Sequence, residues 1–438
     1  MASLDRALRA VYSVGMAAAQ PLLRRKLRRR GVAEPGYLEA VDERFGRYAT
    51  DGPALLRAGP RLWVHAVSLG ETRAVAVLVA ALRERLPGLQ LVLTHGTATG
   101  RAEGRKLLLP GDLQAWLPWD TPGAVARFLA HFRPAAGVLV ETEVWPNLVA
   151  GCRTAGVPLV LANARLSDKS LRGAERIALL SRPAFAGLAA VWAQSEDDAR
   201  RLRGLGAAVA GVFGNLKFDM APNPAQLEAG RRWRHAADRP VLLLASSREG
   251  EEALWLAAVR ALPRAVQWLV VPRHPQRFDE VAGLLQAAGL RVSRRSGWSA
   301  LGPDDAPPPA DVWLGDSLGE MALYYGLADA CLLGGSYADT GGQNLIEAAA
   351  CGCPVVMGPS TFNFADAALL AEAAGAAFRV ADMEGAVAAA ARLVADGARL
   401  GLARSAALEF ASAHRGAAAR TAHALCALLA DRAPGPAG

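Results

Sequence analysis

The chain has 438 residues, of which 52% are hydrophobic and 21% are charged, and its formal net charge is +8. This length predicts two or three domains, and this composition excludes a disordered chain, a collagen and a coiled coil. Five cysteines without a CxxC pair favour a reducing compartment and argue against structural zinc.

The positive charge is concentrated at the N-terminus. Residues 1–31 carry eight Lys and Arg side chains against Asp5, a net charge of +7, so the rest of the chain carries only +1. No nucleic-acid-binding motif accompanies that remainder, so no nucleic-acid partner is expected. Fourteen uncharged residues separate Arg9 from Arg24, which is fewer than the ~20 of a membrane-spanning helix. We expect residues 1–31 to form an anchor helix on anionic lipid, with a solvated basic cap as the alternative.

Beyond residue 31, apolar runs typical of buried parallel strands alternate with helical patterns. The first series is 61–68, 89–95, 136–142, 157–164 and 189–194, and the second is 240–247, 266–273, 290–295, 311–316, 330–336 and 353–359. A polar segment around 220–240 separates them. This pattern predicts two doubly wound α/β domains with a ligand between the carboxyl ends of their strands. The expected domains are 32–225 and 226–402, with a helix and tail over 403–438 and a surface loop over 300–310.

Polar motifs directly follow the strands of the first domain. Glu71, in HAVSLGE, is expected at the start of a helix, where its carboxylate is either a general base or a first-turn partner of the helix dipole. Glu141 and Glu143 alternate at a strand end, which without a nearby Asp-x-Asp is a weak magnesium signal. Lys217, in GNLKFD, is either a cation for a phosphate or an exposed loop lysine.

The second domain carries a candidate nucleotide site. Residues 336–354 form a Gly-Gly turn before a helix, whose N–H groups suit a phosphate, and Glu347 is either a ribose ligand or a dipole partner. Arg273 is either a phosphate ligand or a solvated strand-end arginine. Residues 315–319 match the G-x-S-x-G motif of hydrolases, but the later histidines lie in the terminal helical segment, which disfavours an esterase.

The motifs HAVSLGE, ETEVWPN, NARLS, GNLKFD, VPRHP, GDSLGE, GGQNLIEAAACGCPVVMGP and TFNF occur in this order between about residues 43 and 364. This series resembles the 3-deoxy-D-manno-octulosonic acid (Kdo) transferases of lipopolysaccharide synthesis. The resemblance implies an α/β GT-B glycosyltransferase fold, with two Rossmann-like domains facing across an interdomain cleft and an N-terminal basic anchor helix. It also implies an inverting enzyme that moves Kdo from CMP-Kdo to the lipid A precursor (lipid IVA). This enzyme would use no metal or cofactor and would act at the cytoplasmic face of the inner membrane.

The resemblance also assigns roles to individual residues. Glu71 resembles the base that deprotonates the acceptor hydroxyl, and Glu141 and Lys217 resemble groups that support the transition state. The residues matching the CMP contacts are Pro272, Arg273, Leu318, Gly319, Glu320, Asn344, Leu345, Ile346 and Glu347. Further cleft residues are Ser68, Gly70, Ser246, Ser247, Gly342 and Gln343.

Two departures from the family pattern stand out. The chain has GGQN where the family usually has GGHN, and Arg248 where a histidine often follows two small residues. Gln343 is therefore expected to weaken or alter one nucleotide contact. Two alternatives remain: another GT-B transferase that uses a UDP-sugar on a lipid A-type acceptor, and a non-catalytic two-lobed binding protein.

Overall fold

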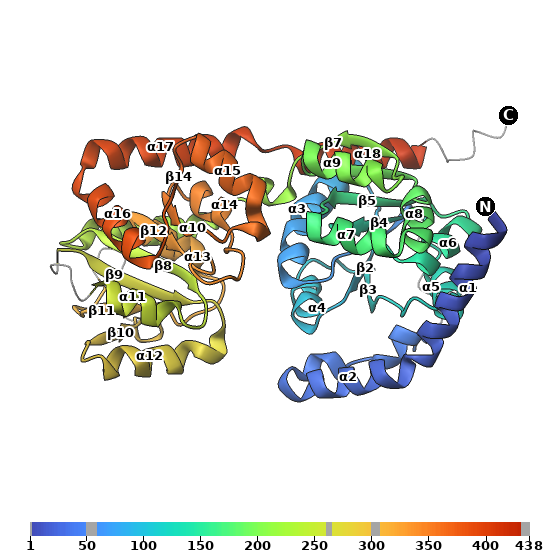
Figure 1. The fold of residues 1–438 in the computed structure, drawn as a ribbon, viewed down its shortest axis with the longest axis horizontal. Coiled ribbons are helices and arrows are strands. Elements are labelled where there is room, and N and C mark those ends of the chain that lie inside the picture. Colours follow the sequence, from blue (N-terminus) through green and yellow to red (C-terminus); the bar gives the residue numbers. More distant parts are fainter. Residues whose placement is uncertain (1, 50–58, 260–264, 299–306, 431–438) are drawn as a thin grey trace. The chain divides into compact units, whose positions relative to one another are not determined.

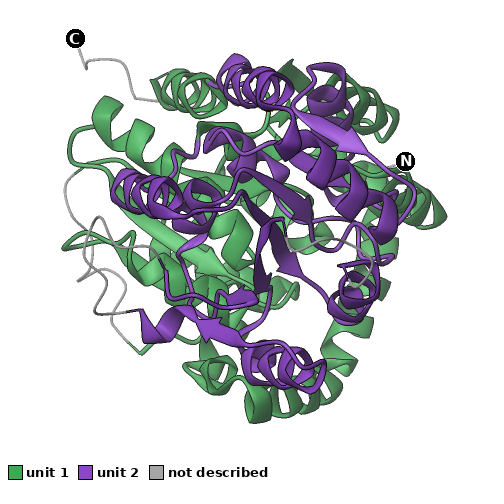
Figure 2. Cartoon of the chain, turned by 90° about the vertical axis from the view of Figure 1, so that its left-hand side faces the viewer, with its two compact units in different colours: residues 1–219, 416–438 green, residues 220–415 purple. Residues whose placement is uncertain are grey.

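A computed structural model describes residues 2–49, 59–259, 265–298 and 307–430 of the chain (Figure 1). The chain forms two compact units (Figure 2). Unit 1 comprises Met1–Asp219 and Gly416–Gly438, and unit 2 comprises Met220–Arg415. The division thus falls after Asp219 and not after residue 225. The predicted C-terminal helix is in fact two helices, α17 (Gly397–Ala413) and α18 (Ala417–Ala430), and α18 belongs to unit 1.

Unit 1 is built on a seven-stranded parallel sheet in the order β3-β2-β1-β4-β5-β6-β7. The strands are β1 (Arg61–His65), β2 (Gln90–His95), β3 (Leu113–Trp116), β4 (Ala136–Val140), β5 (Leu159–Ala164), β6 (Ala190–Ala193) and β7 (Val209–Val212). All five predicted segments form strands. Strands β3 and β7 were missed: each has only four residues, and Gln114 or Gly211 interrupts its apolar run.

Helices on both faces of this sheet bury its apolar side chains. They are α3 (Leu69–Arg85), α4 (Ala98–Arg105), α5 (Pro122–Phe132), α6 (Pro146–Thr154), α7 (Asp168–Arg176), α8 (Ala178–Ala186) and α9 (Glu196–Gly204). Val64 pairs with Leu93 on one side and Val138 on the other, and all three are fully buried. When helices cover both faces of a sheet, the side chains on both faces of each strand are apolar. The strands therefore appear in the sequence as continuous apolar runs and not as alternating apolar and polar residues.

The N-terminal segment forms α1 (Ala2–Ala18) and α2 (Gln20–Ala33), which are part of unit 1. Helix α1 contacts α6 and α8, and the Ser13 hydroxyl lies 3.1 Å from Oδ1 of Asn147. Its outward face is apolar, with Val11 and Val14 each 70% exposed. None of the described helices has the length and apolar character needed to cross a membrane.

Unit 2 repeats the design with strand order β10-β11-β9-β8-β12-β13-β14. Its strands are β8 (Val241–Ser247), β9 (Gln267–Pro272), β10 (Val292–Arg294), β11 (Val312–Leu314), β12 (Ala330–Leu333), β13 (Val355–Met357) and β14 (Ala377–Arg379). All six predicted segments form strands, and β14 was missed. Its longer helices include α10 (Pro224–Ala236), α11 (Glu251–Val259), α12 (Phe278–Ala287), α15 (Ala365–Ala373) and α16 (Met383–Ala395). The predicted polar separator therefore contains α10, and most of the predicted 300–310 loop lies outside the described residues.

Candidate functional site

Glu71 lies in the first turn of α3, shortly after β1. Ser68 caps this helix by accepting the Glu71 N–H, and the Glu71 carboxylate accepts hydrogen bonds from the Ser68 hydroxyl (3.0 Å) and the Val67 N–H (2.7 Å). This reciprocal arrangement resembles a capping box. Burial and the nearby charge of Glu141 raise the Glu71 pKa to about 7, although both hydrogen bonds oppose that shift. Glu71 therefore caps the helix and also has the pKa of a general base at neutral pH.

Glu141 and Lys217 form an ion pair in the same unit. Glu141 directly follows β4, and its φ of 62° lies in the left-handed region, which is uncommon for glutamate. Lys217 lies on the turn η4 (Leu216–Asp219), and its Nζ is 3.2 Å from Oε1 of Glu141. Both side chains are more than four-fifths buried. A strained backbone beneath a buried ion pair is typical of functional sites.

The structure therefore brings the three predicted catalytic residues of unit 1 together. Glu141 pairs with Lys217 and acts electrostatically on Glu71. Ser68 and Gly70 belong to the same first turn of α3 as Glu71. Glu143 instead accepts a hydrogen bond from Nε1 of Trp145 at 2.8 Å. Among the described residues, no group of three or more His, Cys, Asp or Glu side chains is arranged to hold a metal ion.

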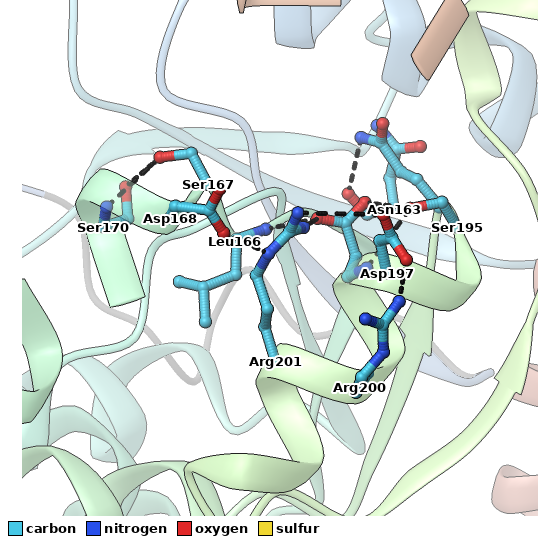
Figure 3. Close-up of polar contacts among 11 residues, drawn as sticks. Asn163, Leu166, Ser167, Asp168, Ser170, Ser195, Asp197, Arg200 and Arg201 are labelled. Carbon is cyan, nitrogen blue, oxygen red and sulfur yellow. Dashed lines mark hydrogen bonds and ion pairs between the residues drawn. The ribbon is translucent and has the colours of Figure 1, made fainter. Parts of the chain in front are cut away.

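Asn163 is a residue of this region to which the sequence analysis gave no role, although its NARLS motif was noted. It lies at the end of β5, beside the strand that leads to Glu141, and its backbone carbonyl accepts a hydrogen bond from Gln194 (3.0 Å, Figure 3). Farther along the same segment, Ser167 caps α7, and Asp168 pairs with Arg201 at 2.7 Å (Figure 3). The signal for Asn163 in the sequence was a polar side chain at the end of an apolar strand.

In unit 2, the predicted nucleotide residues follow four neighbouring strands, β11-β9-β8-β12. Ser246 and Ser247 end β8, Pro272 and Arg273 end β9, residues 318–320 follow β11, and residues 342–347 follow β12. Because these strands are parallel, their carboxyl ends meet at one edge of the sheet. The sequence spacing correctly predicted this convergence.

Arg273 connects three of these strand ends. Its backbone N–H donates to the Ser247 carbonyl at 3.0 Å, and its Nε donates to Oε1 of Gln343 at 3.1 Å. The neighbouring His274 lies 2.6 Å from Nη1 of Arg248. Burial, together with the charges of Arg248, Arg273 and Arg277, lowers the pKa of His274. This concentration of positive charge suits a phosphate.

Two fully buried carboxylates, missed by the sequence analysis, hold the loops of this edge. Glu251 accepts hydrogen bonds from the backbone N–H groups of Arg248 (2.8 Å) and Gly335 (2.7 Å). Glu252 accepts one from the Ser247 hydroxyl at 2.6 Å and pairs with Arg277 at 2.8 and 3.0 Å. They are the first two residues of α11, shortly after β8, a position that could have drawn attention to them.

Other predicted residues make different contacts. Leu318 is 70% exposed, the Gly319 carbonyl accepts from Gln226 (2.9 Å), and Glu320 pairs with Arg295 (2.8 Å). Asn344 precedes α14 (Leu345–Ala350), and its Oδ1 is buried without a hydrogen-bond partner within the described ranges. Glu347 lies within that short helix.

The G-x-S-x-G segment is not a hydrolase site in this fold. The Ser317 hydroxyl lies 2.5 Å from the Tyr324 hydroxyl and also bonds to Glu320. A nucleophilic serine needs a histidine base in contact with it. The partners of Ser317 are a tyrosine and a glutamate, and neither is a histidine base. These contacts remove the esterase alternative.

The chain is similar in sequence to proteins of a known family. The family described as 3-deoxy-D-manno-octulosonic-acid transferase (kdotransferase) matches residues 39–220. The chain is 50% identical over 430 residues to the 3-deoxy-D-manno-octulosonic acid transferase of Bordetella pertussis, covering 95% of this chain and 98% of that protein. It is 33% identical to the Haemophilus influenzae protein of the same name, covering 81% and 82%.

Among solved structures, Anabaena Alr3699/HepE in complex with UDP is similar in fold. The TM-score is 0.57 at 14% identity, and the match covers 85% of this chain and 100% of that chain. The predicted α/β GT-B fold is confirmed.

Proposed function

Because the chain belongs to the 3-deoxy-D-manno-octulosonic acid (Kdo) transferase family, we propose that it transfers Kdo from CMP-Kdo to the lipid A precursor lipid IVA, with inversion at the anomeric carbon. Membership of this family supports the transfer of Kdo in lipopolysaccharide biosynthesis as the activity of the chain. The donor, the acceptor and the stereochemistry are the proposed part. The observation that best supports deprotonation of an acceptor hydroxyl is the Glu71 carboxylate, which Val67 and Ser68 hold in place and whose pKa is raised to about 7.

Glu71 acts first on the acceptor. Its carboxylate takes the proton of the acceptor hydroxyl as the hydroxyl oxygen attacks the anomeric carbon of Kdo. The bond from that carbon to the phosphate oxygen of CMP breaks, and its electron pair leaves with CMP. A single displacement of this kind inverts the anomeric centre. The hydrogen bonds from Val67 and Ser68 fix the orientation of the carboxylate.

Lys217 and Arg273 supply the positive charge that this reaction requires. The anomeric carbon gains oxocarbenium character and the leaving phosphate gains negative charge, so fixed cations and dipoles lower the barrier. In unit 1, Glu141 provides a negative charge and Lys217 provides a positive charge, and both side chains are largely buried. In unit 2, Arg273, held by Gln343, binds the phosphate. Since these side chains provide the charge, we propose that transfer needs no metal ion or cofactor.

The cytidine and ribose of the donor would lie among the remaining residues of the unit 2 edge. Asn344 offers a buried oxygen that lacks a donor among the described residues, and Glu347 offers a carboxylate to the ribose hydroxyls. The loop of Leu318, Gly319 and Glu320 would contact the base. Leu318 is exposed, so its side chain is available to cover an aromatic base.

We also propose that the protein binds to the cytoplasmic face of the inner membrane through α1 and α2. The apolar outward face of α1 suits the lipid interface, and the six basic residues of α2 suit anionic headgroups. The acceptor lipid lies in that membrane, so binding there would bring enzyme and acceptor together.

Mass spectrometry of the product tests the proposal. Purified protein incubated with CMP-Kdo and a tetraacyl lipid A precursor should add the mass of one or more Kdo residues, and the Glu71→Gln variant should not. The alternative is a transferase that uses a UDP-sugar. Calorimetric titration with CMP and UDP separates the two, because stronger binding of UDP would contradict the proposed donor.

A further inference from the structure

Asn163 has a backbone conformation that few residues adopt. Its φ is 50°, in the left-handed region, and Glu141 at the end of the neighbouring strand has the same kind of conformation. The pairing of β5 with β6 shifts register between Leu161 and Ala164, so the strand is irregular at this residue. Asparagine tolerates this region better than most residues other than glycine.

The side chain of Asn163 holds the start of the Lys217 turn. Oδ1 of Asn163 accepts a hydrogen bond from the backbone N–H of Leu216 at 3.0 Å, in a buried position. Leu216 is the first residue of η4, and Lys217 follows it. The Lys217 ammonium group then reaches Glu141 at 3.2 Å. Two adjacent strand ends thus hold the residue that precedes this lysine and the charged group of the lysine itself.

Packing stability alone does not explain an asparagine at this position. The residue is 2% exposed, and its Nδ2 has no hydrogen-bond acceptor among the residues that the structure describes. An unsatisfied buried donor destabilises the folded state, whereas an apolar side chain of similar shape avoids that cost. The left-handed backbone favours asparagine at this position, and the contact with Leu216 gives its side chain a use that an apolar residue cannot supply.

We infer that Asn163 is a positioning residue for Lys217: it fixes the turn that carries the lysine and, being buried, does not itself touch substrate. This inference rests on the proposed role of Lys217 in transfer. A misplacement of a charged group by about 1 Å can cost a factor on the order of 100 in rate. Loss of Asn163 should therefore act on kcat through the lysine and leave donor binding intact.

The test variant is Asn163→Gly in the full chain. Glycine adopts a left-handed backbone without strain, so this change removes the hydrogen bond and keeps the conformation accessible. We expect kcat to fall by a factor of about 10–100 while KM for CMP-Kdo stays within about twofold. Ser167→Ala is the matched control: it removes the cap of α7 in the same segment but no bond to η4, and should keep kcat unchanged.

A double-mutant cycle with Lys217→Met shows whether Asn163 acts through the lysine. Adding Asn163→Gly to Lys217→Met should reduce kcat no further. A further loss equal to that of Asn163→Gly alone would overturn the inference, as would normal kcat in Asn163→Gly when Lys217→Met is impaired. Normal kcat in Lys217→Met would instead contradict the proposed function of the lysine.

A circular-dichroism melt of each variant checks folding. Should Asn163→Gly not fold, Asn163→Asp takes its place, because it keeps an acceptor of the same size for the Leu216 N–H. That variant should keep kcat within about threefold, and a loss of a hundredfold would overturn the inference.

Discussion

The ammonium group of Lys217 lies 3.2 Å from Oε1 of Glu141, which is 76 residues earlier in the chain. Glu141 in turn raises the pKa of Glu71, after the larger effect of burial. A lysine, a carboxylate and a carboxyl with a pKa near 7 thus form one electrostatic group in unit 1. Because Glu141 contacts Lys217 and also acts on Glu71, substitutions among them should not be additive.

Replacement of Glu71 by glutamine should remove the base and keep the shape. We expect transfer to fall by a factor on the order of 10² to 10⁴, the range for loss of general-base catalysis, while CMP-Kdo affinity changes little. Single-turnover kinetics measure the chemical step. Near-normal turnover would place the base elsewhere, with Glu141 the next candidate. A large loss of thermal stability would identify Glu71 as a capping residue only.

The pKa of Glu71 also predicts two pH dependences with opposite signs. The base must be ionised, so kcat/KM should fall as pH drops below about 7. The stability of the fold should change in the opposite direction and decrease as pH rises. The pKa is raised above its ordinary value of 4.5, so the folded state favours the protonated form, and the stability that this provides is lost as pH rises from 4.5 through about 7. The melting temperature of wild type should therefore decrease relative to Glu71→Gln over this range. A difference that is constant with pH would contradict the raised pKa.

Removal of the Arg273 guanidinium should weaken donor binding. Arg273→Ala is expected to cost about 2–4 kcal/mol of CMP-Kdo binding free energy if the phosphate contact is desolvated. Gln343→Ala should cost less, since it only releases the guanidinium. Isothermal titration with CMP measures both. The control is Arg291→Ala, an exposed arginine of the same unit that pairs with Asp311, and its affinity should equal wild type. If Arg273→Ala bound CMP as tightly as wild type does, Arg273 would be a solvated strand-end arginine and not a phosphate ligand.

The proposed membrane contact is testable without deleting α1, which is packed against unit 1. Replacing Val11 and Val14 with serine should weaken binding to phosphatidylglycerol vesicles with no change in melting temperature, since both side chains are exposed. Replacing four arginines of α2 with glutamine should make the residual binding insensitive to salt. Co-sedimentation measures both effects. Unchanged partitioning of every variant at low and high salt would contradict the anchor.

Chelation should leave transfer unaffected, because side chains supply the positive charge in the proposed mechanism. The measurement is the initial rate of Kdo transfer before and after dialysis against EDTA, with readdition of magnesium. Loss of activity that magnesium restores would show that a metal ion takes part, and the carboxylates of Glu141 and Glu143 would then be tested as its ligands.

The positions of the predicted strands could be read from the sequence because both sheets are parallel and covered on both faces. The stretches 136–140 and 241–245 are apolar throughout, so the pattern there is unambiguous. Strands β3, β7 and β14 are only three or four residues long, and Gln114, Gly211 or Arg379 interrupts or ends the apolar run of each. The return of α18 to unit 1 was not predictable either, since an Ala-rich amphipathic helix fits many surfaces.

The candidate site was predictable in residue type and order but not in contact. Strand-end motifs indicated Glu71, Glu141, Lys217 and Arg273. No spacing rule reveals that Lys217 contacts Glu141, or that Asn163 holds the adjacent peptide, because these contacts join segments that only the folded sheet brings together. Glu251 was missed for the same reason: its partners are backbone N–H groups, which leave no trace in the sequence.

Unit 1 consists of two separate segments of the chain, and the second segment, Gly416–Gly438, follows all of unit 2. Asp219, the last residue of η4, accepts hydrogen bonds from the backbone N–H groups of Gly416 and Ala418, where the chain returns as α18. Unit 2 is one uninterrupted segment, so a ribosome completes it before it completes unit 1. Unit 2 is therefore free to fold while the turn that bears Lys217 still lacks its partner at the start of α18. A nascent chain can therefore make the contacts of Asp219 with Gly416 and Ala418 only after all of unit 2 has been synthesised.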